Sequence, residues 1–252
     1  MAHQKGIFKI TGTIGDVTFY KSKNGYLVRE KGGIDAKRIA TDPAFQRTRE
    51  NGMEFGRAGK AGKVLRAALR PLLTNVKSSG MASRMTQIMI KVIQADMVSE
   101  RGLRNVIDGE AELLTGFEFN QTGALSTTFH APYTAAIDRV TGEMTISVDP
   151  FVPVDMITAP QGTTHFKITS GGAEIDFEQE TFENALESTL VIPYSATVTS
   201  LISHILSLPA NSTKPLFLAL GIEFYQDING RKYALKNGSY NPLAIIKVDG
   251  GV

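Results

Sequence analysis

The sequence predicts an α+β protein with an N-terminal β-meander or hairpin arm, a small helical layer and a C-terminal antiparallel β-sandwich of jelly-roll or immunoglobulin-like type. Three changes in apolar periodicity indicate this plan. Apolar residues alternate over residues 5–33, recur at helical spacing over 41–107, and then form short runs between turn signals. We therefore divide the chain into an arm at 1–41, a helical layer at 42–112 and a sandwich domain at 113–252.

The arm has the sequence KGIFKITGTIGDVTFYKSKNGYLVREKGG. Its apolar side chains come in pairs two residues apart, as in Val17 and Phe19 and again in Tyr26 and Val28. Asn24-Gly25 is a strong hairpin signal, because both residue types accept positive φ in a type I′ turn. A meander of this size is marginal by itself. We expect it to pack on the rest of the chain or to add to the edge of a neighbour's sheet.

The helical layer begins with a helix start signal, in which Thr41 or Asp42 is the N-cap and Pro43 lies in the first turn. Asn51-Gly52 is a candidate interruption of this helix, and Pro71 a candidate kink before the helical run ends near residue 76. Two further elements follow, a helix over MASRMTQIMIKVIQADM and a short element over SERGLRNVID.

The C-terminal region has many short apolar runs between turn signals, including Thr141-Gly142, Gly171-Gly172 and Asn229-Gly230. This spacing is typical of a sandwich. A proline-rich segment, DPFVPVDMITAPQG, is expected to connect the two sheets. The predicted strands are ALSTTFHA, YTAAIDRV, EMTISVDP, HFKITSG, AEIDFEQE, ATVTSLISHILSL, LFLALGIEFYQDI and RKYALKN.

The composition is that of an ordinary folded protein, with 252 residues of which 42% are hydrophobic. The absence of cysteine excludes disulfides and thiolate chemistry. The first residues contain no apolar signal-peptide core, and no apolar run is long enough to span a bilayer. We expect cytoplasmic synthesis without a signal peptide, and leave the final location open, including a particle or an exported assembly.

Charge is distributed unevenly along the chain. Residues 1–107 contain 20 Lys and Arg against 8 Asp and Glu, a net charge of +12, whereas residues 108–252 contain 7 against 17, a net charge of −10. This asymmetry favours a polyanion bound to the first half, or the first half of one copy meeting the second half of another. The alternative explanation of the charge asymmetry is that the two halves face each other within one chain.

The stretch EFGRAGKAGKVLRAALRP resembles a phosphate-binding loop but lacks its spacing and its hydroxyl residue. It also lacks the close glycine pair of a dinucleotide-binding fingerprint. As a helix, it carries a stripe of glycines that lets another backbone approach, beside a parallel stripe of cations. The glycines are Gly56, Gly59 and Gly62, and the cations are Arg57, Lys60, Lys63 and Arg66.

The acidic counterpart is AEIDFEQETFENALE, in which Glu174, Asp176 and Glu178 alternate with apolar residues. Carboxylates on one strand face could hold a metal ion, but a half-exposed strand shows the same alternation. The four histidines have no metal-ligand spacing, and no nucleophile elbow is present. We therefore predict no catalytic, cofactor-binding or metal-binding residue, and identify no small-molecule substrate.

The blocks GIFKITGTIGDVTFYK and TDPAFQRTRENG resemble an uncharacterised protein family found widely in Bacteroidota genomes. This resemblance covers roughly residues 4–70 and implies no activity, so it transfers no functional residue. The general plan of arm, helical layer and sandwich is also similar to that of subunits of phage particles and tubular assemblies, which is an analogy at the level of the fold.

These observations lead us to expect a non-enzymatic structural protein that assembles with copies of itself into a filament, tube or phage-like particle. Nucleic-acid binding by the basic helical layer is the alternative, and a hydrolase or metal enzyme is a third hypothesis. The expected assembly interface comprises Val17, Phe19, Tyr26, Val28, Gly56, Arg57, Gly59, Lys60, Gly62, Lys63, Arg66, Glu174, Asp176 and Glu178.

Overall fold

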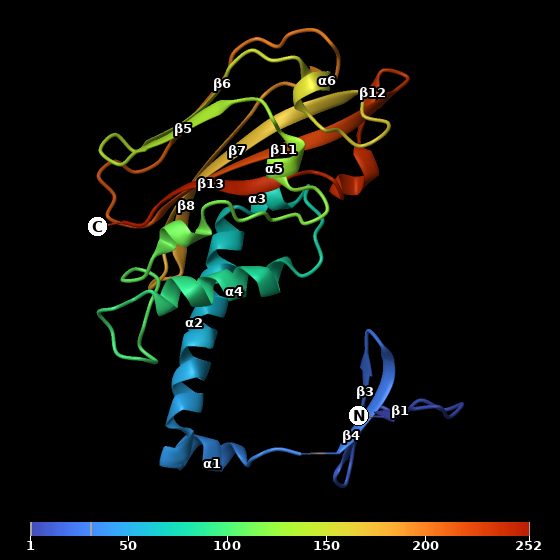
Figure 1. The fold of residues 1–252 in the computed structure, drawn as a ribbon, viewed down its shortest axis with the longest axis vertical. Helices are drawn as coiled ribbons and strands as arrows, with labels where there is room; N and C mark the ends of the chain where they lie inside the picture. The colour runs from blue at the N-terminus through green and yellow to red at the C-terminus, as the bar shows by residue number, and fades with distance from the viewer. Residues whose placement is uncertain (1, 31, 252) are drawn as a thin grey trace. The chain divides into compact units, whose positions relative to one another are not determined.

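The computed structural model of the protein describes residues 2–30 and 32–251. The chain forms two compact units that divide between Arg49 and Glu50, named unit 1 and unit 2 below. Unit 1 is the smaller, N-terminal unit, drawn in blue in Figure 1. Helices and antiparallel sheets are both present, as the α+β prediction requires.

Unit 1 contains an antiparallel sheet with the strand order β1-β4-β3-β2, which confirms the predicted meander and adds a short leading strand. The hairpin turn differs from the prediction by one residue. Ser22 pairs with Gly25, so Lys23 and Asn24 form the loop, and only Gly25 of the predicted pair has a positive φ, +99°. The strands are β1 (Ala2–His3), β2 (Gly12–Ile14), β3 (Val17–Ser22) and β4 (Gly25–Glu30).

A short helix, α1 (Ala36–Thr41), and a 3₁₀ turn, η1 (Pro43–Phe45), follow the sheet. The carboxylate of Asp42 caps this turn by accepting a hydrogen bond from the backbone N–H of Ala44 at 2.9 Å. Pro43 occupies its first position, as the start signal predicts.

The long helix α2 (Gln46–Ala68) runs uninterrupted through Asn51-Gly52, so the expected interruption there is wrong. A single exposed glycine costs a helix about 1 kcal/mol, which the surrounding turns outweigh. The helix ends before Leu69, and α3 (Arg70–Leu73) starts with Pro71 in its first turn, which confirms the predicted break. The amphipathic helix α4 (Met81–Gln94) follows.

The segment 99–108 is built of turns and bends, so the short helical element predicted there is wrong. Gly102 has a φ of +89°, and the carboxylate of Asp96 accepts hydrogen bonds from the backbone N–H groups of Val98, Ser99 and Asn105. Such bonds from a side chain to the backbone compete with helix formation. The only helical turn nearby is the 3₁₀ turn η2 (Ala111–Leu114), within the described residues.

The rest of unit 2 is a sandwich of a three-stranded sheet, with the order β10-β6-β5, on a six-stranded sheet built around β11 and β7. The smaller sheet comprises β5 (Tyr133–Asp138), β6 (Glu143–Val148) and β10 (Ile202–Ser207). The larger comprises β7 (His165–Asp176), β8 (Thr181–Ser188), β9 (Ile192–Pro193), β11 (Leu216–Ile228), β12 (Arg231–Ala234) and β13 (Leu243–Asp249). Single turns are α5 (Leu125–Thr128), α6 (Pro153–Met156) and η3 (Leu235–Gly238).

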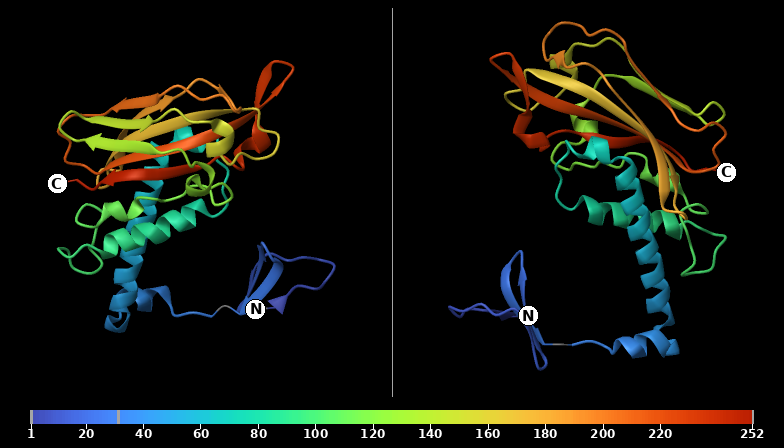
Figure 2. Two further views of the ribbon diagram at one scale, coloured as in Figure 1. Left: turned by 45° about the horizontal axis from the view of Figure 1, so that its top comes forward. Right: turned by 180° about the vertical axis from the view of Figure 1, so that it is seen from behind.

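The six-stranded sheet is covered on both faces. The helices pack on one face, where Leu65 and Met89 share a hydrophobic core with Phe217. The smaller sheet packs on the other face, where Ile146 shares a second core with Leu218. The right-hand view in Figure 2 shows β5 and β6 on the opposite side of β7 and β11 from α4. The helical layer and the sandwich are therefore parts of one unit with two hydrophobic cores.

Gly171-Gly172 lies in the middle of β7, so the turn predicted there is wrong. A Cβ atom on Gly171 would lie 2.7 Å from Cδ1 of Leu72, and one on Gly172 would lie 2.8 Å from Sδ of Met144. The two glycines therefore let β7 approach a helix on one face and the smaller sheet on the other. The sequence signal is the same as for a turn, but its cause here is close packing.

The predicted list of strands needs further correction. The run ALSTTFHA forms the helical turn α5, because the carboxylate of Glu118 accepts hydrogen bonds from the backbone N–H groups of Leu125 and Ser126 at 2.8 and 3.0 Å. Three strands have no counterpart in the predicted list: β8 and β9, which pair with β7, and β13, which pairs with β11.

Candidate functional site

The four residues expected to form an interface in the arm share one face of the unit 1 sheet. Phe19 pairs directly with Val28, while Val17 and Tyr26 lie two residues away on the same face of their strands. All four are half-buried. Ile14, which pairs with Val17 and therefore shares this face, is 62% exposed. The same face carries two charged residues, because Lys21 pairs with Tyr26, over whose ring its ammonium lies, and Glu30 pairs with Val17. The sheet thus presents an apolar face, defined by the five apolar residues and bordered by these two charges.

Unit 1 has no hydrophobic core of its own. None of its described residues, 2–30 and 32–49, is buried. In the segment that connects β1 and β2, the side chains of Ile7 and Phe8 are 95% and 87% exposed. A sheet normally buries one face to be stable, so this unit needs a surface against which to pack.

The glycine stripe of α2 divides into two parts with different surroundings. A Cβ atom on Gly62 would lie 2.9 Å from Cγ of Met85, so this glycine lets α4 cross α2 closely. A Cβ atom on Gly56 or Gly59 would meet no atom within 4 Å. Packing within the chain therefore explains Gly62, and leaves Gly56 and Gly59 beside open space.

Two cations of the stripe contact the chain itself. Arg57 donates hydrogen bonds through Nη1 to the backbone carbonyls of Gly102, at 3.2 Å, and of Arg104. Lys60 forms an ion pair with Glu180 at 3.2 Å, although both side chains remain largely exposed. An exposed pair of this kind contributes little to stability.

The other two cations of the stripe differ from each other. Arg66 donates through Nε to the carbonyl of Gly62 at 3.0 Å, one helical turn earlier. Lys63 is exposed and has no ion-pair partner among the described residues.

The three acidic residues of the predicted interface do not form one exposed row of carboxylates. Glu174 is buried, and Lys214 lies 3.6 Å from both Glu174 and Asp176. Glu178 lies beyond the end of β7, in its turn to β8, and its side chain is exposed without an ion pair in the described chain. Strand alternation therefore fails after Asp176, where the carboxylate of that residue accepts hydrogen bonds from the turn.

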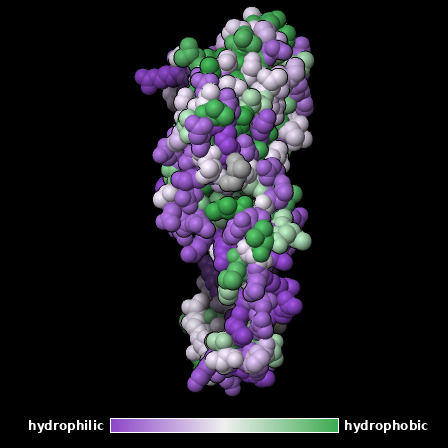
Figure 3. Space-filling view, turned by 90° about the vertical axis from the view of Figure 1, so that its left-hand side faces the viewer, coloured by the Kyte–Doolittle hydropathy of each residue, from purple (hydrophilic) through white to green (hydrophobic). Residues whose placement is uncertain are grey.

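A groove of about 620 Å³ lies in unit 2 between the N-terminal half of α2, the loop 103–107 and the turn from β7 to β8. Four predicted interface residues line it together: Gly56, Arg57, Lys60 and Glu178. On the side of the molecule viewed in Figure 3, hydrophobic side chains reach the surface among hydrophilic ones. The structure thus brings together residues that are far apart in the sequence.

The sequence analysis missed the apolar lining of this groove. Met53, Leu103 and Ile107 are 48%, 56% and 41% exposed, and half-buried Phe177 lies beside them. Leu103 and Ile107 belong to the segment that the sequence suggested was a short helix. One signal in the sequence could have indicated this lining. The segment is rich in charged residues, and its apolar residues follow neither the helical nor the strand period.

Buried carboxylates hold the loop side of the groove. Glu54 of α2 accepts a hydrogen bond from the backbone N–H of Gly102 at 2.9 Å, and Asp96 accepts from Val98, Ser99 and Asn105. Burial alone would raise the pKa of Asp96, but the N–H groups of Ser99, Asn105 and Val98 outweigh it and lower the pKa to about 2. The groove is therefore bounded by a fixed loop.

The most suggestive catalytic pair in the chain is enclosed in the sandwich. Nδ1 of His204 lies 2.7 Å from Oγ of Ser170, and both residues are buried between the two sheets. Burial lowers the pKa of His204, so its imidazole is neutral at physiological pH, although Glu187 acts in the opposite direction. This pair serves as a hydrogen-bonded polar contact in the core.

A second polar cluster surrounds Glu223, beside a hollow of about 530 Å³. Its carboxylate accepts hydrogen bonds from Asn75 at 2.8 Å and from the hydroxyl of Tyr225, and Lys167 lies 3.2 Å away. Burial, together with the hydrogen bond to Glu223, raises the pKa of Tyr225. The carboxylate is thus fully engaged in holding the turn after α3 on the sheet.

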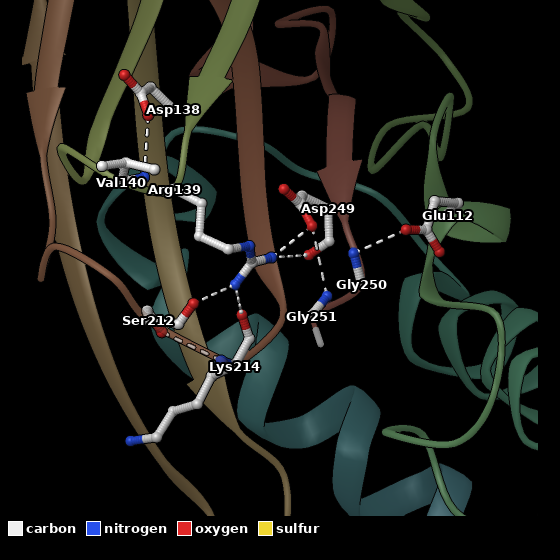
Figure 4. Close-up of polar contacts among 9 residues, drawn as sticks. All are labelled: Glu112, Asp138, Arg139, Val140, Ser212, Lys214, Asp249, Gly250 and Gly251. Atoms are coloured by element: carbon white, nitrogen blue, oxygen red, sulfur yellow. Dashed lines mark hydrogen bonds and ion pairs between the residues drawn. The ribbon is translucent and has the colours of Figure 1, made fainter.

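A third cluster, around Arg139, ties the ends of three segments together (Figure 4). The guanidinium donates to the carbonyls of Ser212 and Lys214 at 2.6 and 2.8 Å, and pairs with the carboxylate of Asp249. The hydrogen bond from Arg139 is the largest cause that holds the pKa of Asp249 below its usual range. This cluster is structural, since Nη1 and Nη2 of Arg139 donate to two other segments of the fold.

Among the residues that the structure describes, no group of three or more His, Cys, Asp or Glu side chains could hold a metal ion. Within the same residues, no helix is long and apolar enough to cross a membrane. Comparisons with protein-family models, with curated proteins and with solved structures found no match.

Proposed function

We propose that this protein is a non-enzymatic structural protein that assembles with copies of itself into a filament, tube or particle. The observation that carries the proposal is the apolar face of unit 1, which no part of unit 1 itself covers. Its five residues, defined above, share one side of a sheet in which no described residue is buried.

The physical reason is the cost of leaving this face in water. Burying apolar surface contributes about 25 cal/mol per Å², and a four-stranded sheet without a second layer forgoes that contribution. A second copy of the same protein is always present when the protein is made, and it can supply the surface that covers this face. Contacts between unlike surfaces of successive copies lead to open filaments or closed rings.

The charge asymmetry supports assembly as well. The first 107 residues have a net charge of +12 and the remainder −10, so head-to-tail contacts bring opposite charges together. Part of this complementarity is used inside the chain, as in the ion pair between Lys60 and Glu180. The remainder makes the association of copies sensitive to salt.

The test is sedimentation velocity and negative-stain microscopy of the full chain over a wide range of protein concentration, at low and high salt. We expect larger species that grow with concentration. Phe19→Asp places a charge on the apolar face and should abolish them, whereas Thr18→Asp, its neighbour on the opposite face, should not. An unchanged protein that stays monomeric under all these conditions would contradict the proposal.

Nucleic-acid binding by the helical layer stays a prediction. Arg57 and Arg66 donate to backbone carbonyls and Lys60 pairs with Glu180, which leaves fewer cations free for phosphates. A binding assay with duplex and single-stranded DNA and RNA at low salt tests this alternative, and absence of binding would remove it.

A further inference from the structure

We infer that a small acidic hollow between the ends of β7 and β8 and the segment before β11 binds a guanidinium group. The hollow lies in unit 2 and has a volume of about 110 Å³. It does not depend on the proposed self-assembly, because one copy supplies the whole lining. The lining residues are Glu174, Asp176, Thr181, Phe182, Glu183 and Lys214.

The register of β7 and β8 places three carboxylates on one face of the sheet. Glu174 pairs directly with Glu183, and Asp176 pairs with Thr181. Residues directly opposite each other in antiparallel strands share a face, as do residues two apart in one strand. Like charges that face each other across a strand pair are destabilising, and a cation bound between them relieves their repulsion.

The carboxylate of Glu174 lacks a hydrogen-bond donor. Its side chain is only 7% exposed, and Oε2 is buried without a hydrogen-bond partner in the described chain. Oε1 lies 3.6 Å from Nζ of Lys214, which is longer than a hydrogen bond. A buried carboxylate oxygen without a donor is unfavourable. The hollow therefore favours a ligand that brings both N–H donors and a positive charge.

Lys214 offsets only part of the acidity. Its ammonium also lies 3.6 Å from Asp176, and its side chain is 43% exposed. Three carboxylates against this one ammonium leave a formal charge of −2 in the lining, and Glu183 is exposed without an ion pair among the described residues. Arg139 binds the backbone carbonyl of Lys214, but it does not line the hollow and pairs with Asp249. Figure 4 shows the side chain of Lys214 extending away from the Arg139 guanidinium.

The spacing and the size of the hollow select a guanidinium among cations. Within the described residues, no three carboxylates are placed to hold one metal ion. A guanidinium is planar, and its five N–H donors form a fixed fork that can bridge carboxylates farther apart. Pockets that enclose a whole small molecule measure about 300–1,000 Å³. A hollow of about 110 Å³ therefore admits a group of this size and not a larger ligand.

The test uses methylguanidinium as the probe and methylurea as its neutral counterpart of nearly the same shape. Saturation-transfer difference NMR detects the methyl signal of either ligand on a protein of any size, and a titration at constant ionic strength gives the Kd. We expect methylguanidinium to bind saturably, and methylurea to give no saturable signal, because only the cation is attracted by the carboxylates.

Three variants of the full chain locate the site. Glu174→Gln keeps the size of the side chain and removes its charge, so the Kd of methylguanidinium should rise about tenfold or more. Glu183→Gln should also raise it, and this exposed position should tolerate the change even if Glu174→Gln does not fold. The matched control, Glu178→Gln, removes a carboxylate from the turn after β7 that does not line the hollow, so the Kd should stay unchanged.

Four results would overturn the inference. The first is the absence of saturable binding, and the second is equal binding of methylurea. The third is binding that survives both Glu174→Gln and Glu183→Gln, because the probe would then lie elsewhere. The fourth is displacement of methylguanidinium by an equimolar amount of calcium chloride, which would make the hollow a metal site.

The guanidinium can belong to a free molecule or to an arginine of a second copy, and sedimentation velocity distinguishes these two sources. If saturating methylguanidinium removes the larger species of the unchanged protein and methylurea does not, the group is an arginine of a second copy. If the larger species persist, the ligand is a free molecule. A protein that is monomeric throughout would contradict self-assembly and would leave this site to a free molecule.

Discussion

Asp96 is the residue whose ionisation the loop beside the groove depends on most. Its side chain is buried and accepts hydrogen bonds from three backbone N–H groups. Its pKa of about 2 lies below the ordinary value of 3.8, so the ionised form stabilises the fold above pH 4 or so, and this contribution is lost as the pH falls toward 2.

We therefore predict that Asp96→Ala lowers the free energy of unfolding by about 1–3 kcal/mol at neutral pH, because buried N–H groups lose their acceptor. The difference between the unchanged protein and this variant should shrink as the pH falls from about 4 to about 2. Urea unfolding at several pH values measures it. A difference that does not vary with pH would contradict the assignment.

The three glycines of α2 give a second prediction at this scale. Gly56→Ala and Gly59→Ala should each raise the free energy of unfolding by about 0.4–1 kcal/mol, because alanine restricts the unfolded chain and meets no atom within 4 Å. Gly62→Ala should lower it by about 1–3 kcal/mol, since its Cβ would lie 2.9 Å from Met85. Denaturant unfolding of the three variants measures these changes. Equal effects at all three positions would contradict the close contact between Gly62 and Met85.

At the scale of elements, β7 is a strand whose close packing on both faces requires small residues. It is covered on one face by α3 and on the other by the smaller sheet, and Gly171 and Gly172 each allow one of these contacts. We expect Gly171→Ala and Gly172→Ala each to lower the free energy of unfolding by about 1–3 kcal/mol, the usual cost of overpacking. Thermal unfolding tests this, and a variant of unchanged stability would contradict the close packing at that glycine.

Helices and strands that are determined by the pattern of their own residues could be predicted from the sequence. β11 was predicted at its observed bounds because LFLALGIEFYQDI is an uninterrupted strand-forming run, and α4 because its apolar residues follow the helical period. Elements set by distant partners could not. The carboxylate of Glu118 turns ALSTTFHA into a helical turn, and Asp96 and Glu54 hold 99–108 as a loop.

The same division holds for the candidate site. Its glycine and charged residues, such as Gly56 and Glu178, could be identified because they stand in regular patterns of glycines, cations and carboxylates. Its apolar lining, such as Leu103, was not, because a groove between a helix, a loop and a strand turn exists only once the chain has folded. Pattern alone also could not reveal that Gly62 and Gly56 have different neighbours.

At the scale of the whole molecule, the central feature is the contrast between the two units. Unit 2 has two hydrophobic cores, whereas unit 1 has an ordered sheet in which no described residue is buried. We propose that unit 1 gains its covering layer from a second copy, so we expect its stability to depend on protein concentration.

The most direct measurement is hydrogen exchange of the backbone amides of β3 and β4 in the full chain at low and high protein concentration. We expect fast exchange in dilute solution and protection that grows as larger species form, whereas Phe19→Asp should exchange fast at every concentration. Exchange in β3 and β4 that is equally slow at all concentrations, in a protein that remains monomeric, would contradict it.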